Sequence, residues 1–175
     1  QFGNHGSFFA QLGSGKGIQP FREVKHYDDF LARIARFPVL NDSAIGNMRE
    51  GIAAGVVQPV PVVEKSIPQF AAHVVDDVEQ SVFWGPIKAM PADFPDAERE
   101  RLTAAYREAI ANTLVPAYAK MRDFLRDEYL PQARTGVGQM HLPDGKAWYA
   151  HNVKVNTTTD LTPAQIHQIG LDEVA

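Results

Sequence analysis

The longest helical pattern in the sequence runs from Asp96 to Leu130, and it constrains the fold more than any other feature. Apolar residues recur there every three or four positions, at Leu102, Tyr106, Ile110, Leu114, Ala117, Met121, Phe124 and Leu125. This spacing places them on one face of an α-helix that would span most of a small domain. Pro116 lies inside the pattern. We expect a kink or a short break there, because an internal proline costs a helix about 3 kcal/mol.

Shorter helical patterns precede this one. The first contains Tyr27, Phe30, Leu31, Ile34 and Phe37, and Pro38 should end it. The second contains Ile45, Met48, Ile52 and Val56 and should close at the proline-rich residues 58–61. The third runs from Val62 to Val78, and Pro68 should kink or break it.

Proline-rich segments join these helices. Residues 83–86 (FWGP) and 90–95 (MPADFP) should form a rigid loop packed against the core. Residues 143–145 (PDG) are a strong turn signal, and at most one small β-hairpin fits near residues 137–149. We therefore predict an all-α fold of kinked antiparallel helices with proline-rich connections.

The sequence signals two helices at the C-terminal end. Trp148, Tyr149 and Val153 favour the first. Thr162 should cap the second, with Pro163 at its first position and Gln165 completing a capping box. The chain stops within that helical pattern, so we expect residues 1–175 to be a single helical region from a larger helical domain.

The N-terminal residues 1–20 predict a flexible entry segment. Residues 13–17 (GSGKG) suggest a phosphate-binding loop, and thus a nucleotide-binding enzyme. However, Ala10 and Gly17 stand where such a loop needs glycine and Ser or Thr, and no strand precedes it. The segment therefore does not support nucleotide binding.

Composition excludes several classes of protein. The formal net charge of -4 gives no basic surface for nucleic acid, and cysteine is absent. No apolar run approaches the ~20 residues that span a bilayer. Hence we expect neither a nucleic-acid partner nor a membrane span.

No complete catalytic or metal-binding arrangement is visible. The six histidines are His5, His26, His73, His141, His151 and His167, and no two of them have a zinc-ligand spacing. We predict no catalytic residue and no metal ligand in this chain, and we interpret His73 as a packing or surface side chain. The candidates for substrate binding are Tyr149, His151, Asn152 and Thr157, whose hydroxyl, imidazole and amide groups could line a polar cleft.

Four blocks of sequence together resemble the bacterial family called domain of unknown function 885. They are residues 47–55 (NMREGIAAG) with 58–59 (QP), 124–131 (FLRDEYLP), 145–149 (GKAWY), and 157–163 (TTTDLTP) with 166–174 (IHQIGLDEV). The resemblance implies a mostly helical protein related to zinc peptidases of the neurolysin and carboxypeptidase Taq type. It also implies that zinc binds in the C-terminal half of the intact protein, since no residue here matches the metal motif.

On this resemblance the chain is the N-terminal portion of a zinc metallopeptidase that walls a peptide channel. Its partners would be a peptide substrate and the remainder of its own polypeptide, with exposed apolar faces suited to a homodimer. The compartment is left open between cytoplasmic and periplasmic or secreted. The alternative is a non-enzymatic helical interaction module, which would bind a partner through the aromatic residues Phe83-Trp84 and Trp148-Tyr149.

Overall fold

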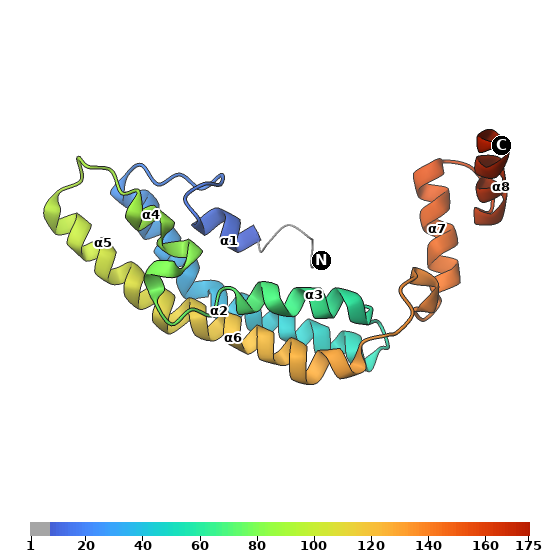
Figure 1. The fold of residues 1–175 in the computed structure, drawn as a ribbon, viewed down its shortest axis with the longest axis horizontal. Coiled ribbons are helices and arrows are strands. Elements are labelled where there is room, and N and C mark those ends of the chain that lie inside the picture. The colour runs from blue at the N-terminus through green and yellow to red at the C-terminus, as the bar shows by residue number, and fades with distance from the viewer. Residues whose placement is uncertain (1–7) are drawn as a thin grey trace.

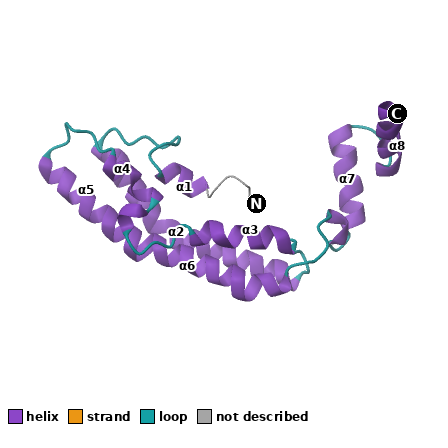
Figure 2. Ribbon diagram, in the orientation of Figure 1, coloured by secondary structure: helices purple, strands orange, loops and turns teal. Residues whose placement is uncertain are grey.

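The computed structural model describes residues 8–175, which form helices and loops without a β-strand (Figure 2). The predicted all-α class is confirmed. The α-helices are α1 (Phe8–Gly13), α2 (Val24–Ala53), α3 (Val60–Ala71), α4 (Gly85–Lys88), α5 (Asp96–Ala109), α6 (Val115–Phe124), α7 (Gly145–Thr157) and α8 (Pro163–Val174). The 3-10 turns are η1 (Val78–Gln80), η2 (Val82–Trp84), η5 (Leu130–Gln132) and η6 (Gln139–His141), and the π-helical turns are η3 (Ile110–Leu114) and η4 (Leu125–Tyr129).

Helix α2 continues through Pro38, so the prediction that this proline ends a helix is wrong. Pro38 cannot donate to the carbonyl of Ile34, which costs helical stability. The inward side chains on both sides of it are buried, among them Ile34, Phe37 and Ile45. Because each buried apolar side chain contributes about 1.5–3 kcal/mol, packing offsets the loss of one hydrogen bond.

The segment from α5 to η4 is one long helical rod, as the apolar pattern predicts. The π-helical turn η3 ends at Leu114, next to Val115 and Pro116, which confirms the expected irregularity there. A second π-helical turn, η4, precedes Pro131. In both places the wider turn lies just before a residue that cannot donate a backbone hydrogen bond.

The two long helices run parallel to each other, whereas antiparallel neighbours were expected. Residue numbers increase in the same direction along both helices: near their starts Tyr106 Oη donates to the Tyr27 carbonyl, and towards their ends Arg49 Nε donates to Glu128 Oε1. Helix α3 returns antiparallel to them and packs against α6, where the ring of Phe70 lies 6.1 Å from that of Tyr118. The connection through η1, η2 and α4 then brings the chain back to the starting end (Figure 1). This irregular connection, with Phe83 and Trp84 buried, is the packed loop that the sequence predicts.

The core has two clusters along the rod. The first is aromatic and centres on Tyr27, Phe30, Phe83, Tyr106 and Tyr118, all at most 1% exposed. The second lies towards the end of α2 and consists of Ile45, Val63, Met121, Phe124, Leu125 and Tyr129. Helices α2, α3 and α6 supply both clusters, and therefore form one packed bundle.

The N-terminal segment differs from the expected flexible entry. From Phe8 it forms α1, and Phe9 stacks on Phe30 with ring centroids 5.5 Å apart. Gly13 lies so close to the rings of Phe30 and Phe83 that a Cβ would collide with them. Gly13, which is interpreted from the sequence as part of a flexible segment, thus allows close packing. Residues 1–7 lie outside the described part of the chain.

Helices α7 and α8 stand apart from the bundle and form an arm joined to it by residues 133–138 (Figure 1). Arg134 holds this junction: its Nε donates to the Val57 carbonyl at 3.0 Å and its Nη1 to the Gly138 carbonyl at 2.8 Å and to the Gly136 carbonyl. The arm contains η6 where a small hairpin had been allowed. Among the helices of residues 8–175, none combines the length and the apolar character that a membrane span requires.

Candidate functional site

All four predicted binding residues, Tyr149, His151, Asn152 and Thr157, lie on α7. The helix begins where the sequence places a turn: Asp144 adopts a left-handed conformation with φ 53°, and its carbonyl accepts from Trp148 N at 3.0 Å. Gly145 follows, where a Cβ would collide with the Gln139 carbonyl. Local turn chemistry therefore sets α7 closely against η6.

Two of the four residues meet at one cavity. His151 and Asn152 line a hollow of about 380 Å³ together with Ala147 and Trp148. These residues share a face of the helix because side chains three and four positions apart are neighbours. Asn152 Nδ2 donates to Gln139 Oε1 at 3.1 Å, which fixes the amide against η6.

Two residues that line this cavity, Ala147 and Trp148, were not predicted, and Trp148 has the larger side chain. Its side chain is 53% exposed, unlike Trp84, which is 4% exposed in the core. From the sequence, Trp148 is assigned to a helix and, in the alternative function, to partner binding, and its spacing of three and four residues from His151 and Asn152 indicates a shared face. An indole beside an imidazole and an amide offers stacking and hydrogen bonding to a ligand.

The other two candidates lie elsewhere on α7. Tyr149 is 41% exposed but does not line the cavity. Thr157 ends the helix, about 12 Å along the axis from Tyr149, and its Oγ1 donates to the Val153 carbonyl at 2.8 Å. The predicted cluster is thus two residues at a cavity and two outside it.

Within residues 8–175, no group of three or more histidine or acidic side chains could hold a metal ion. The cavity also lacks a nucleophile paired with a base among its lining residues. Its aromatic, imidazole and amide groups can bind a ligand, but they do not form a catalytic arrangement.

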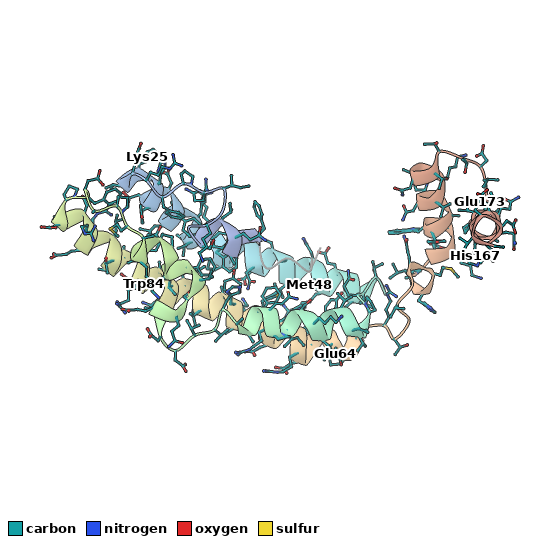
Figure 3. All side chains as sticks on the ribbon, turned by 45° about the horizontal axis from the view of Figure 1, so that its top comes forward. Lys25, Met48, Glu64, Trp84, His167 and Glu173 are labelled. Atoms are coloured by element: carbon teal, nitrogen blue, oxygen red, sulfur yellow. The ribbon has the colours of Figure 1, made fainter. Side chains whose placement is uncertain are left out.

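The remaining histidines that the sequence considers have simple placements. The ring of His73 lies 4.4 Å from the ring of Tyr118, and burial lowers its pKa, so the prediction of a packing histidine is confirmed. His167 lies on α8 in the arm, as does Glu173, far from Trp84 in the bundle (Figure 3). Neither histidine adds a group to the α7 cavity.

Comparisons with known proteins agree with this architecture. A family described as "Bacterial protein of unknown function (DUF885)" matches residues 1–175. The crystal structure described as that of "the putative lipoprotein from Colwellia psychrerythraea" is similar with a TM-score of 0.80 and 23% identity. No curated protein matches the sequence.

That structural match covers 89% of this chain and 27% of the other chain. This chain therefore spans about a quarter of that protein's length. Because the bundle and junction up to residue 134 make up a smaller share of the chain than the match covers, the shared fold extends into the arm. At this identity the similarity shows the fold alone.

Proposed function

The chain belongs to the DUF885 family of bacterial proteins of unknown function, and on that premise we propose that it is the helical N-terminal portion of a zinc metallopeptidase. In this proposal it walls a peptide-binding channel and does not hold the metal. The resemblance of the family to zinc peptidases of the neurolysin type supports the reaction class. The observation that supports a binding role is the cavity on α7.

The α7 cavity offers what an extended peptide needs from a channel wall. Trp148 presents an exposed indole for a side chain, and Asn152, held by its hydrogen bond to Gln139, presents an amide group for peptide N–H and C=O groups. One amide donor of Asn152 is already used, so the pair is held in place before a ligand arrives. Such preorganisation lowers the entropy lost on binding.

The zinc ion implied by the resemblance does not fit the part of the chain described here. A zinc site needs three or four nitrogen, oxygen or sulfur ligands, and residues 8–175 bring no such group together. We therefore propose that other residues of the intact protein hold zinc, and we assign no catalytic step to this chain.

The experiment uses the intact protein. Zinc content is measured by elemental analysis, and hydrolysis of a mixed peptide library is followed by mass spectrometry. The double variant His151→Ala, Asn152→Ala should raise KM about 5- to 30-fold with little change in kcat, because it removes binding made equally in substrate and transition state.

The matched control is Lys154→Ala, on the same helix. Among residues 8–175, the Lys154 ammonium forms a surface ion pair with exposed Asp160, at 2.6 Å, so its loss should leave KM and zinc content unchanged. An intact protein without zinc and without hydrolysis would refute the peptidase proposal. Active protein whose KM ignores the double variant would refute the channel wall alone.

The arm also favours a second candidate, a helical interaction module. Exposed apolar side chains lie on α7, on α8 and on the segment between them, namely Trp148, Tyr149, Val155, Leu161, Ile169, Leu171 and Val174. Such a surface is typical of an interface, with the remainder of the polypeptide or a second copy as the partner. Sedimentation of the intact protein tests the second copy: a monomer at all concentrations excludes the dimer.

A further inference from the structure

A groove of about 460 Å³ opens between the two long parallel helices, and both carry a proline there. Pro38 comes from α2 and Pro116 from the start of α6, just after the π-helical turn η3. We call this hollow the proline groove. It lies in the bundle, away from the arm, and is independent of the function proposed for α7.

The two prolines remove backbone donors from the walls of the groove, because a proline has no N–H. One of them, Pro116, follows the π-helical turn η3, and turns of this type occur frequently at functional sites. Neither proline can therefore donate a backbone hydrogen bond to a ligand in the groove.

Asn41 adds a side-chain acceptor. It is only 5% exposed, and its Nδ2 donates to the Ala117 carbonyl at 3.1 Å. Since a carbonyl can only accept, this bond fixes which end of the amide carries the oxygen. No described side chain leaves a fully buried polar atom without a partner. Oδ1 of Asn41, which receives no hydrogen bond from the described residues, is therefore not fully buried, and Asn41 is one of the residues that line the groove.

The charged groups at the edge cancel each other. Lys120 Nζ binds Asp42 Oδ1 at 2.6 Å, and both side chains are more than half exposed. The other carboxylate oxygen of Asp42 remains an acceptor. Asn112 and Thr113 complete the polar edge, while Ala35 and the two proline rings form apolar walls.

We propose that the proline groove binds a primary ammonium group carried on an alkyl chain. An ammonium group has three N–H donors and no acceptor, which matches the excess of acceptors around Asn41 Oδ1. The methylene groups would lie on the proline rings and Ala35. An anion fits poorly, since Lys120, the cation among the described residues that line the groove, is already paired with Asp42. A free amine and a lysine side chain share this chemistry.

The test is an NMR titration of the ¹⁵N-labelled chain, followed at the Asn41 side-chain amide and the Ala117 backbone amide. n-Butylammonium should shift both signals in a saturable way, whereas butyltrimethylammonium, with equal charge but no N–H donor, should not. Equal responses to both ions, or none to either, would overturn the proposal. Titrations with 1,4-diaminobutane and with a lysine tripeptide assign the source, according to which binds more tightly.

Variants then locate the site. Pro116→Ala adds a backbone N–H donor at the groove, and Thr113→Val removes a hydroxyl; the pair together should weaken n-butylammonium binding about tenfold. Asn41→Leu should abolish it, and a thermal melt shows whether that variant is folded. The control is Gln132→Ala, in a separate groove of about 490 Å³ beside Arg49. Binding unchanged in Pro116→Ala, Thr113→Val, or weakened equally by the control, would refute this location.

Discussion

We predict that the Arg134 side chain stabilises the junction between the bundle and the arm. Replacing Arg134 with alanine removes donors to the carbonyls of Val57, Gly136 and Gly138. The backbone pairing is retained, because Val60 N donates to the Arg134 carbonyl at 2.9 Å and Arg134 N to the Gln58 carbonyl at 3.2 Å. The variant should therefore loosen residues 135–142 without releasing the arm from the bundle.

The magnitude follows from the kind of bond that is lost. A hydrogen bond from a charged group contributes about 1.5–3 kcal/mol, and the bond to Gly138 is exposed and worth less. We expect local opening to become easier by about 2–3 kcal/mol, which lowers amide protection roughly 30- to 150-fold. Lysine at this position should fall between, since it lacks the planar set of donors.

Hydrogen–deuterium exchange measures this directly. The His141 and Leu142 amides, which donate to the Gly138 and Gln139 carbonyls, report on the loop, and amides of α6 report on the bundle. Arg126→Ala is the control, because the ion pairs of Arg126 within the described chain, with Asp123 and Asp127, are exposed. Unchanged amide protection of His141 and Leu142 in Arg134→Ala would refute the conclusion that the Arg134 side chain holds the junction.

Three further predictions concern stability. Leu102→Ala should lower the free energy of unfolding by about 2–5 kcal/mol, because the side chain is 0% exposed, while Val39→Ala, at 69% exposed, should change it little in urea melts. Burial lowers the pKa of His73 below its unfolded value near 6.5. Below about pH 6.5 the unfolded state thus binds more protons than the folded state. The free energy of unfolding should therefore fall as the pH drops below about 6.5, and it should fall less in His73→Phe. Urea midpoints at several pH values would show this. Thr162→Ala should destabilise α8 by about 1 kcal/mol, because Thr162 Oγ1 accepts a hydrogen bond from Gln165 N at 3.3 Å. Faster hydrogen exchange of the Gln165 amide would show this.

Local signals in the sequence predicted several elements correctly. The capping box at the start of α8 is present, with Thr162 N donating to Gln165 Oε1 at 2.8 Å. The expected helix through Trp148 is α7, and the irregularity near Pro116 is η3. All of these depend on residues within about one or two turns of each other, so adjacent sequence contains the information.

The candidate site was predictable only in part. The sequence indicated the right helix and its polar groups, and α7 does bring His151 and Asn152 to one cavity. It could not show that Gln139 meets Asn152, because that contact depends on how the turn at Asp144 folds η6 against α7. Nor could it separate Tyr149 and Thr157 from the cavity.

The sequence by itself determined the all-α class, because apolar spacing and capping are properties of neighbouring residues. Tertiary structure decided what the prolines and glycines do. Pro38 does not end α2, because buried side chains on both sides of it keep the helix intact. Gly13 allows the rings of Phe30 and Phe83 to pack closely against the backbone. Tertiary structure also decided that the two long helices run parallel, since contacts such as Asn41 with Ala117 join residues distant in the chain. The energy of those contacts depends on packing between elements, which no local pattern encodes.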